Sequence, residues 1–166
     1  CKVRELNFHP ANNGGNLLAE DIPRLAVFTD LESLDLSRAP LTDASLASLA
    51  PLKKLRRLNL METGVTSASV ATILAFPQLE YLHGPSTDDW LKLLAGMPTI
   101  RSLDFSRQEI SPQAMEWFKQ YPNLAELRFV ECGEGWTSDK LAPLKDCKLL
   151  SKLEVGNMPI DDNTVE

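Results

Sequence analysis

Apolar residues recur along this chain at a fixed spacing, in copies that begin at residues 22, 46, 70, 91, 115 and 141. Within each copy the apolar positions lie at 0, +3, +6, +9 and +12, with a further one at +14 in all copies but one. The copy that begins at Leu46 continues with Leu49, Leu52, Leu55, Leu58 and Leu60. The exception is the copy that begins at Val70, which ends in Gly84. A pattern this regular predicts one structural unit per copy.

Each copy changes its period halfway, which predicts a helix followed by a strand. Apolar residues three apart suit a short helix with one buried face, and the final apolar residues two apart suit a strand. The expected strands are 5–9, 33–37, 57–61, 81–85, 102–106, 126–130 and 152–156. Their marker leucines are Leu6, Leu34, Leu58, Leu82, Leu103, Leu127 and Leu153. Strands this far apart in the sequence cannot form hairpins, so we expect a parallel sheet with helical crossovers.

Polar residues precede each expected helix and favour its start. Four positions before the first apolar helix residue stand Thr42, Thr66, Thr87, Ser111, Thr137 and Asp161. Their side chains can accept hydrogen bonds from first-turn amides. Pro112 follows Ser111 at the first helical position, where its missing amide hydrogen is not needed.

The stretch from Leu31 to Leu82 resembles the leucine-rich-repeat family, in the version with about two dozen residues per repeat and a Thr-Asp helix start. The resemblance extends from Leu6 to Asp162. It implies an α/β solenoid, or horseshoe, with a parallel sheet on the concave face and short helices on the convex face. The family usually has Asn, Cys or Thr after each strand. This chain has Thr63 and Cys132 at two of these positions but Ala39, Gln108 and Met158 at three others. The Thr-Asp rhythm is similar to that of bacterial members, and F-box substrate receptors use similar repeats.

Length and termini bear on domain organisation. We expect residues 1–166 to form a single repeat domain of six to seven repeats, and no apolar run is long enough to cross a bilayer. Capping units are not visible at either end, so we expect a fragment of a longer array or multidomain protein. Cys1 is compatible with a lipidated terminus or a truncation point, and the second is favoured. Cys147 falls on a core position of the apolar pattern, and Cys132 fits the position that follows a strand in the family. Buried free thiols are favoured for both, which leaves the compartment open.

Charge argues against a nucleic-acid partner. The chain has 17 basic and 23 acidic residues, a net charge of −6. Its one basic cluster, Lys53, Lys54, Arg56 and Arg57, is short and contains no interleaved aromatic residues.

The expected sheet also argues against catalysis. It places His9 and His83, and likewise Asp35 and Asp104, three strands apart, too far to share a metal ion or a proton. His83 next to Asp104 can be read as an oriented base, but no nucleophile stands beside it, and a solvated polar patch is the favoured interpretation. We therefore expect no enzyme activity, no metal site and no cofactor.

Partner binding is expected on the concave face and on the loop rim. The concave candidates are Arg57, Asn59, Tyr81, His83, Asp104 and Arg128. The segments between strand and helix differ in length from one repeat to another at 10–15, 83–86 and 133–136. Such differences are typical of a binding rim, and neutral drift in surface loops explains them equally well. Trp90, placed on a helix face expected to be polar, and Glu134 are the rim candidates. Trp136 is expected in the core.

The sequence thus predicts a non-catalytic module that binds a protein or peptide through the concave sheet and the rim. The alternative is a structural or regulatory repeat segment of a larger enzyme or signalling protein, including an F-box-type substrate receptor. The oligomeric state is left open.

Overall fold

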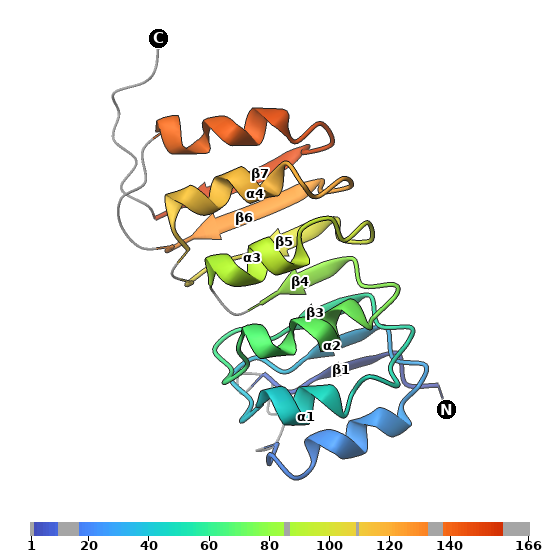
Figure 1. The fold of residues 1–166 in the computed structure, drawn as a ribbon. Helices are drawn as coiled ribbons and strands as arrows, with labels where there is room; N and C mark the ends of the chain where they lie inside the picture. Colours follow the sequence, from blue (N-terminus) through green and yellow to red (C-terminus); the bar gives the residue numbers. More distant parts are fainter. Residues whose placement is uncertain (1, 10–16, 85–86, 109, 133–137, 158–166) are drawn as a thin grey trace. The chain divides into compact units, whose positions relative to one another are not determined.

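The computed structural model describes residues 2–9, 17–84, 87–108, 110–132 and 138–157 (Figure 1). The chain divides into two compact units, residues 1–85 and residues 86–166. The expectation of one repeat domain stays a prediction. The sequence-based interpretations of Cys1, Glu134, Trp136, Thr137 and Asp161 fall outside the described residues.

The first unit is built from strands that alternate with short helices. Its elements are β1 (Glu5–Asn7), η2 (Ile22–Val27), β2 (Ser33–Asp35), α1 (Asp43–Ala47), β3 (Arg57–Asn59), η3 (Ser67–Ser69), α2 (Val70–Leu74) and β4 (Tyr81–His83). Those labelled η are 3-10 helices. The strands pair in parallel and in chain order, with Leu6 opposite Leu34, Leu34 opposite Leu58, and Leu58 opposite Leu82.

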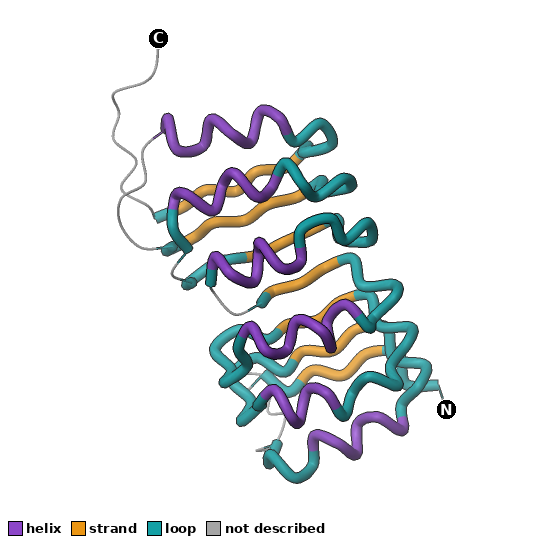
Figure 2. Tube along the Cα trace, viewed as in Figure 1, coloured by secondary structure: helices purple, strands orange, loops and turns teal. Residues whose placement is uncertain are grey.

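The second unit repeats this alternation. Its elements are α3 (Asp88–Leu94), β5 (Ser102–Asp104), η4 (Pro112–Ala114), α4 (Met115–Phe118), β6 (Glu126–Val130), η5 (Ser138–Asp146) and β7 (Lys152–Gly156). Leu103 pairs with Leu127, and Leu127 with Leu153, again in parallel. Within each unit the helices cover one face of the strands (Figure 1, Figure 2). The predicted α/β class, the parallel pairing and the marker-leucine register are therefore confirmed.

The helical segments are short, and some of them wind more tightly than a standard α-helix. Several are 3-10 helices, whose three residues per turn fit apolar residues spaced by three. In the copy that begins at Leu46, all six apolar positions are fully buried. Each such residue contributes about 1.5–3 kcal/mol of transfer free energy. The apolar period therefore stabilises the fold by burial, because helices this short have little stability of their own.

An aromatic cluster forms the core of the second unit. The Phe105 ring stacks on Phe129 with centroids 5.8 Å apart, and Phe118 meets both rings edge-on. The hydroxyl of buried Tyr121 donates a hydrogen bond of 2.6 Å to the Leu91 carbonyl, which satisfies its polar group.

Five strands, β1 to β5, are two residues shorter than predicted, and in four of them the residue at the strand end explains why. These four, β1, β2, β3 and β5, end at Asn7, Asp35, Asn59 and Asp104. In each, the side-chain oxygen accepts the backbone N–H two residues further on, at 2.9–3.0 Å, and this turns the chain. By contrast, β6 and β7 carry Arg128 and Glu154 at this position and run the predicted length.

The helix starts agree only in part with the prediction. Thr42 caps α1 in a capping box with Ser45, and Thr66 caps η3 through the Ala68 amide. Pro112 begins η4 as predicted.

The predicted caps at Thr87 and Ser111 are wrong, since neither side chain caps its own helix. Ser111 instead donates to Asp88 of the preceding repeat. A polar residue at this position can therefore bond between repeats as well as within one.

Candidate functional site

The exposed sheet face of the first unit carries a stacked pair of side chains from neighbouring strands. Arg57 of β3 lies opposite Tyr81 of β4 in the register. The Arg57 guanidinium carbon is 4.7 Å from the Tyr81 ring centroid, which is a cation–π geometry. Arg57 is exposed and Tyr81 is half-buried. Among the described residues Arg57 has no carboxylate partner, so its guanidinium N–H groups remain available for a ligand.

The last residues of the same strands are tied into the fold. The side-chain oxygen of Asn59 accepts the Met61 N–H at 3.0 Å, and His83 lies opposite Asn59. His83 is only 6% exposed, and its carbonyl accepts the Leu60 N–H at 2.7 Å. Both residues lie on the predicted face, but they present less surface to a partner than Arg57 and Tyr81.

In the second unit, Asp104 and Arg128 form an ion pair. Arg128 Nη1 is 3.6 Å from the Asp104 carboxylate, and Arg128 Nη2 is 3.1 Å from the Glu154 carboxylate. Asp104 is 6% exposed, whereas the Arg128 side chain is 49% exposed. Arg128 therefore joins three strands and keeps an exposed side, with its charge already balanced by two acids.

A second row of polar residues follows the strands, and sequence reasoning missed it. Its members stand four residues after a marker leucine and have a positive φ of 50–61°: Arg38, Glu62, Arg107, Glu131 and Asn157. This left-handed conformation is costly for residues other than glycine, by about 1–2 kcal/mol. The signal in the sequence is that this repeat position holds a polar residue, whose charge often changes sign from one repeat to the next.

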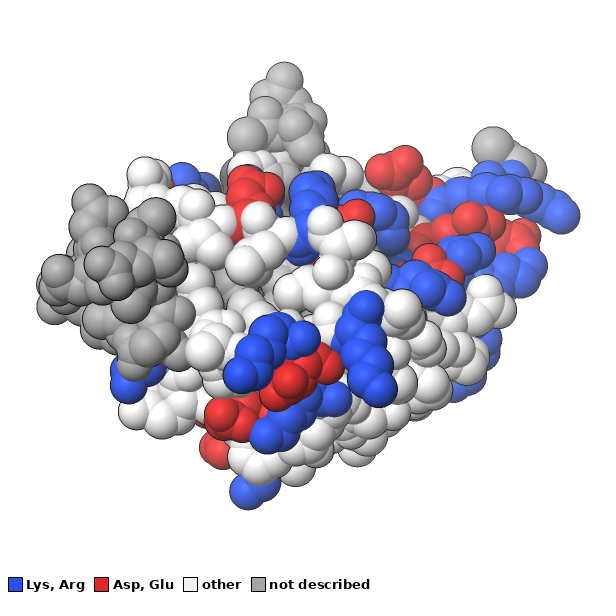
Figure 3. Space-filling view, turned by 90° about the horizontal axis from the view of Figure 1, so that it is seen from above, with Lys and Arg blue, Asp and Glu red and all other residues white. Residues whose placement is uncertain are grey.

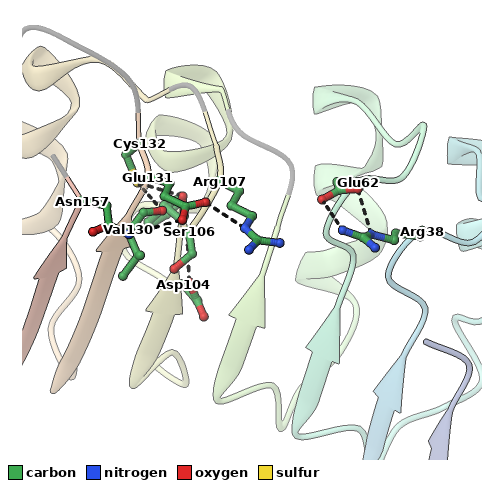
Figure 4. Close-up of polar contacts among 10 residues, drawn as sticks. Arg38, Glu62, Asp104, Ser106, Arg107, Val130, Glu131, Cys132 and Asn157 are labelled. Carbon is green, nitrogen blue, oxygen red and sulfur yellow. Dashed lines mark hydrogen bonds and ion pairs between the residues drawn. The ribbon is translucent and has the colours of Figure 1, made fainter. Parts of the chain in front are cut away.

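Side-chain pairs connect this row between neighbouring repeats (Figure 4). In the first unit Arg38 lies 2.9 Å from Glu62. In the second unit Arg107 lies 2.9 Å from Glu131, which also accepts a bond of 3.3 Å from the Asn157 amide. These charges are satisfied within the chain, so the row aligns the strand ends and offers few free charges.

The structure overturns the rim prediction for Trp90. This residue is only 2% exposed and packs inward from α3 together with Leu91 and Leu94. The prediction assumed a spacing of three, but α3 is a seven-residue α-helix, in which Trp90 and Leu94 lie on the same face. The equivalent residues Ser69 and Ala114 are also buried, whereas Lys140 at the same repeat position is exposed, so the repeat position alone does not decide burial.

Both described cysteines are buried free thiols. Burial raises the pKa of the Cys132 thiol to about 11 and also raises the pKa of Cys147. Cys132 Sγ lies 3.0 Å from the Phe105 carbonyl, as expected for a protonated donor. Among the described residues, no three His, Cys, Asp or Glu side chains form a group that would hold a metal ion. None of the described helices combines the length and the apolar character required to span a membrane.

Comparison with known proteins gives a likeness of fold. No protein-family model matches the chain, and no curated protein matches it in sequence. Among solved structures, an internalin from Listeria monocytogenes superposes with a TM-score of 0.57 at 19% identity. The match covers 90% of this chain and 48% of the internalin chain, so this chain spans about half the length of that structure. At this identity the likeness is one of fold alone.

Proposed function

We propose that this chain is a leucine-rich-repeat solenoid that binds a protein or peptide through the exposed face of its parallel sheet and performs no chemistry there. The repeat register and the fold of the internalin support the solenoid. A sheet of this kind holds side chains in fixed rows, so little conformational entropy is lost when a partner binds.

The observation that carries this proposal is the Arg57–Tyr81 pair. Aromatic residues and arginine are enriched among the residues that dominate binding energy at protein interfaces. The stacked ring orients the guanidinium, and Arg57 has no carboxylate partner among the described residues. The pair therefore offers a preorganised donor beside an apolar surface, which fits a carboxylate or carbonyl group of a partner chain.

The other sheet-face candidates fall into two groups in this proposal: one contacts the partner, and the others support the contact surface. Arg128 contributes an exposed contact in the second unit, and Asn59, His83 and Asp104 position the strands behind the contact surface. Glu134 is proposed as a rim contact. The proposal no longer includes Trp90, because the structure buries it.

The test is affinity capture from cell lysate with the full chain, followed by titration of the purified partner. The sheet-face variant combines Arg57→Ala with Tyr81→Ala. The matched control combines Arg24→Ala with Leu74→Ala, two exposed residues on helices of the same unit. We expect a partner that the wild type and the control bind equally, and a loss of about tenfold or more in affinity with the sheet-face variant.

Two outcomes contradict the proposal. A partner bound equally by all three proteins would move the site away from this face. If circular dichroism shows all three folded and none captures a partner, the alternative of a structural or regulatory segment gains support.

A further inference from the structure

Arg57 differs from the other arginines of the first unit in its partner. Each of the others pairs with a carboxylate at 2.6–3.1 Å: Arg4 with Glu32, Arg24 with Asp21, Arg38 with Glu62, and Arg56 with Glu80. Arg57 instead lies over the Tyr81 ring, and its guanidinium has no carboxylate partner in the described part of the chain. A positive charge on the sheet face is therefore available to an anionic group of a partner.

Ser33 adds a second hydrogen-bond donor next to Arg57. It lies directly opposite Arg57 in the register of β2 and β3, so both side chains leave the same face of the sheet. The Ser33 hydroxyl has no hydrogen-bond partner among the described residues. A hydroxyl can donate to the same anion that a neighbouring guanidinium binds. Two available donors on adjacent strands therefore favour an anionic ligand over a basic one.

Nearby acids limit the charge that this anion can carry. Asp35 stands two residues after Ser33 on the same face of β2, and Glu5 of β1 lies opposite Ser33 on its other side. Both carboxylates repel an anion bound at Arg57, and the repulsion grows in proportion to the charge of the ligand. One guanidinium balances one negative charge. A carboxylate is therefore favoured over a phosphate group, whose charge at pH 7 is about −1.5 to −2.

The Tyr81 ring gives the site an apolar side. Tyr81 lies opposite Arg57 on the strand away from Ser33, and its side chain is half-buried. A carboxylate bound at Arg57 thus has a hydroxyl on one side and an aromatic surface on the other. The partner residue next to the acid covers this ring best when it is apolar.

We propose that the first unit recognises an acidic residue, Asp or Glu, that stands next to an apolar residue in the partner chain. The carboxylate accepts hydrogen bonds from Arg57 and Ser33, and the apolar neighbour packs on Tyr81. This inference rests on the proposed function and names the chemistry of its partner.

Selection from a displayed library of random peptides, with the full chain as bait, tests this specificity. We expect the wild type to enrich peptides that carry Asp or Glu beside an apolar residue. Arg57→Glu should lose these peptides and enrich basic ones, because it reverses the charge at the centre of the site. Arg24→Glu makes the same charge change at an exposed position of η2 in this unit, and should select the same peptides as the wild type.

Substitutions at Ser33 test whether it lies beside the bound acid. Ser33→Asp places a carboxylate opposite Arg57, and should lower the affinity for a selected acidic peptide about tenfold or more because the two acids compete for one guanidinium. Ser33→Asn adds a side chain of the same size without a charge, and should change the affinity by less than about threefold. Circular dichroism verifies that each variant is folded.

The peptide acid and Arg57 should also be coupled. Replacing the acid of a selected peptide by its amide should weaken binding to the wild type about tenfold, since a hydrogen-bonded charge pair is lost. The same replacement should have little effect on binding to Arg57→Ala, because both changes remove the same contact.

The outcomes separate this inference from the proposed function. Peptides that bind the wild type but not the combined Arg57→Ala, Tyr81→Ala variant, and show no preference for acids, overturn the inference and leave the proposed function intact. A phosphoserine peptide that binds about tenfold tighter than its Glu counterpart also overturns it, because the site would then take a doubly charged anion. A folded chain that selects no peptide, or peptides bound equally by every variant of this face, contradicts both.

Discussion

At the scale of single residues, an Asp or Asn side chain ends four of the strands by accepting a backbone N–H two residues further on. Asp35 illustrates this role, because its carboxylate accepts both the Ser37 N–H at 2.9 Å and the Ser37 hydroxyl at 2.6 Å. Arg128 and Glu154 replace Asp or Asn in β6 and β7, and these strands continue, whereas β4 ends at His83 without such an acceptor. A residue with positive φ stands three positions further on, both after Asp or Asn and after Arg128 or Glu154. The left-handed turn at that residue therefore does not require the Asp or Asn side chain.

This role predicts the effect of substitutions at Asp35. Asp35→Ala removes an acceptor from two partly buried donors and should lower the free energy of unfolding by about 1–3 kcal/mol. Asp35→Asn retains the oxygen acceptor and should recover most of the loss, as Asn59 shows at the same position of β3. Urea denaturation followed by circular dichroism measures both values. Equal destabilisation by the two substitutions would show that charge, and not the accepted hydrogen bonds, matters at this position.

At the scale of elements, an aspartate at the helix start couples one repeat to the next. The Asp43 carboxylate of α1 accepts the Thr66 N–H at 2.8 Å and the Thr66 hydroxyl at 2.7 Å, and also the Ser69 hydroxyl. Asp88 of α3 accepts the Ser111 N–H at 3.0 Å in the same way. The aspartate of the Thr-Asp helix start therefore joins successive helices, while the threonine of α1 caps its own helix.

The coupling predicts a pH dependence of stability. Burial raises the pKa of Asp43, but the hydrogen bonds from Ser69 and Thr66 outweigh it, and the pKa falls below its usual 3.8. A carboxyl whose pKa is lowered by folding stabilises the protein above its unfolded pKa, and this contribution is lost as the pH falls through the folded pKa. Asp43→Asn should therefore lower stability at pH 7 and reduce the loss of stability below about pH 4.

Asp89→Asn is the matched control for this measurement, because Asp89 is exposed in the first turn of α3. We expect the control to follow the wild-type profile of unfolding free energy against pH. If Asp43→Asn shows the wild-type slope in acid, its carboxylate does not couple the repeats as described.

At the scale of the whole molecule, the strand register could be predicted from the repeat. The burial of individual polar or aromatic side chains and their ion pairs could not, because these depend on which residues are neighbours in space. The register follows from the sequence because a slip of one residue would expose Leu58 and its equivalents. The inward direction of Trp90 depends on α3 being an α-helix, which a spacing of three does not reveal. The burial of His83 and the ion pairs of Arg128 depend on side-chain contacts that a sequence pattern does not specify. The sheet-face candidates lie on the predicted strands, and their role in binding stays a prediction.

The charge distribution of the molecule predicts that it does not bind nucleic acid. Basic and acidic side chains lie next to each other on the face seen in Figure 3. Two of the four members of the basic cluster near residue 55 are paired with acids, since Lys54 lies 2.5 Å from Asp30 and Arg56 lies 2.6 Å from Glu80. With a net charge of −6, little counterion release is available to drive binding to a phosphate backbone. Gel-shift titrations with duplex and single-stranded DNA should show no complex, even at low salt, and a complex that weakens steeply as salt is raised would contradict this prediction.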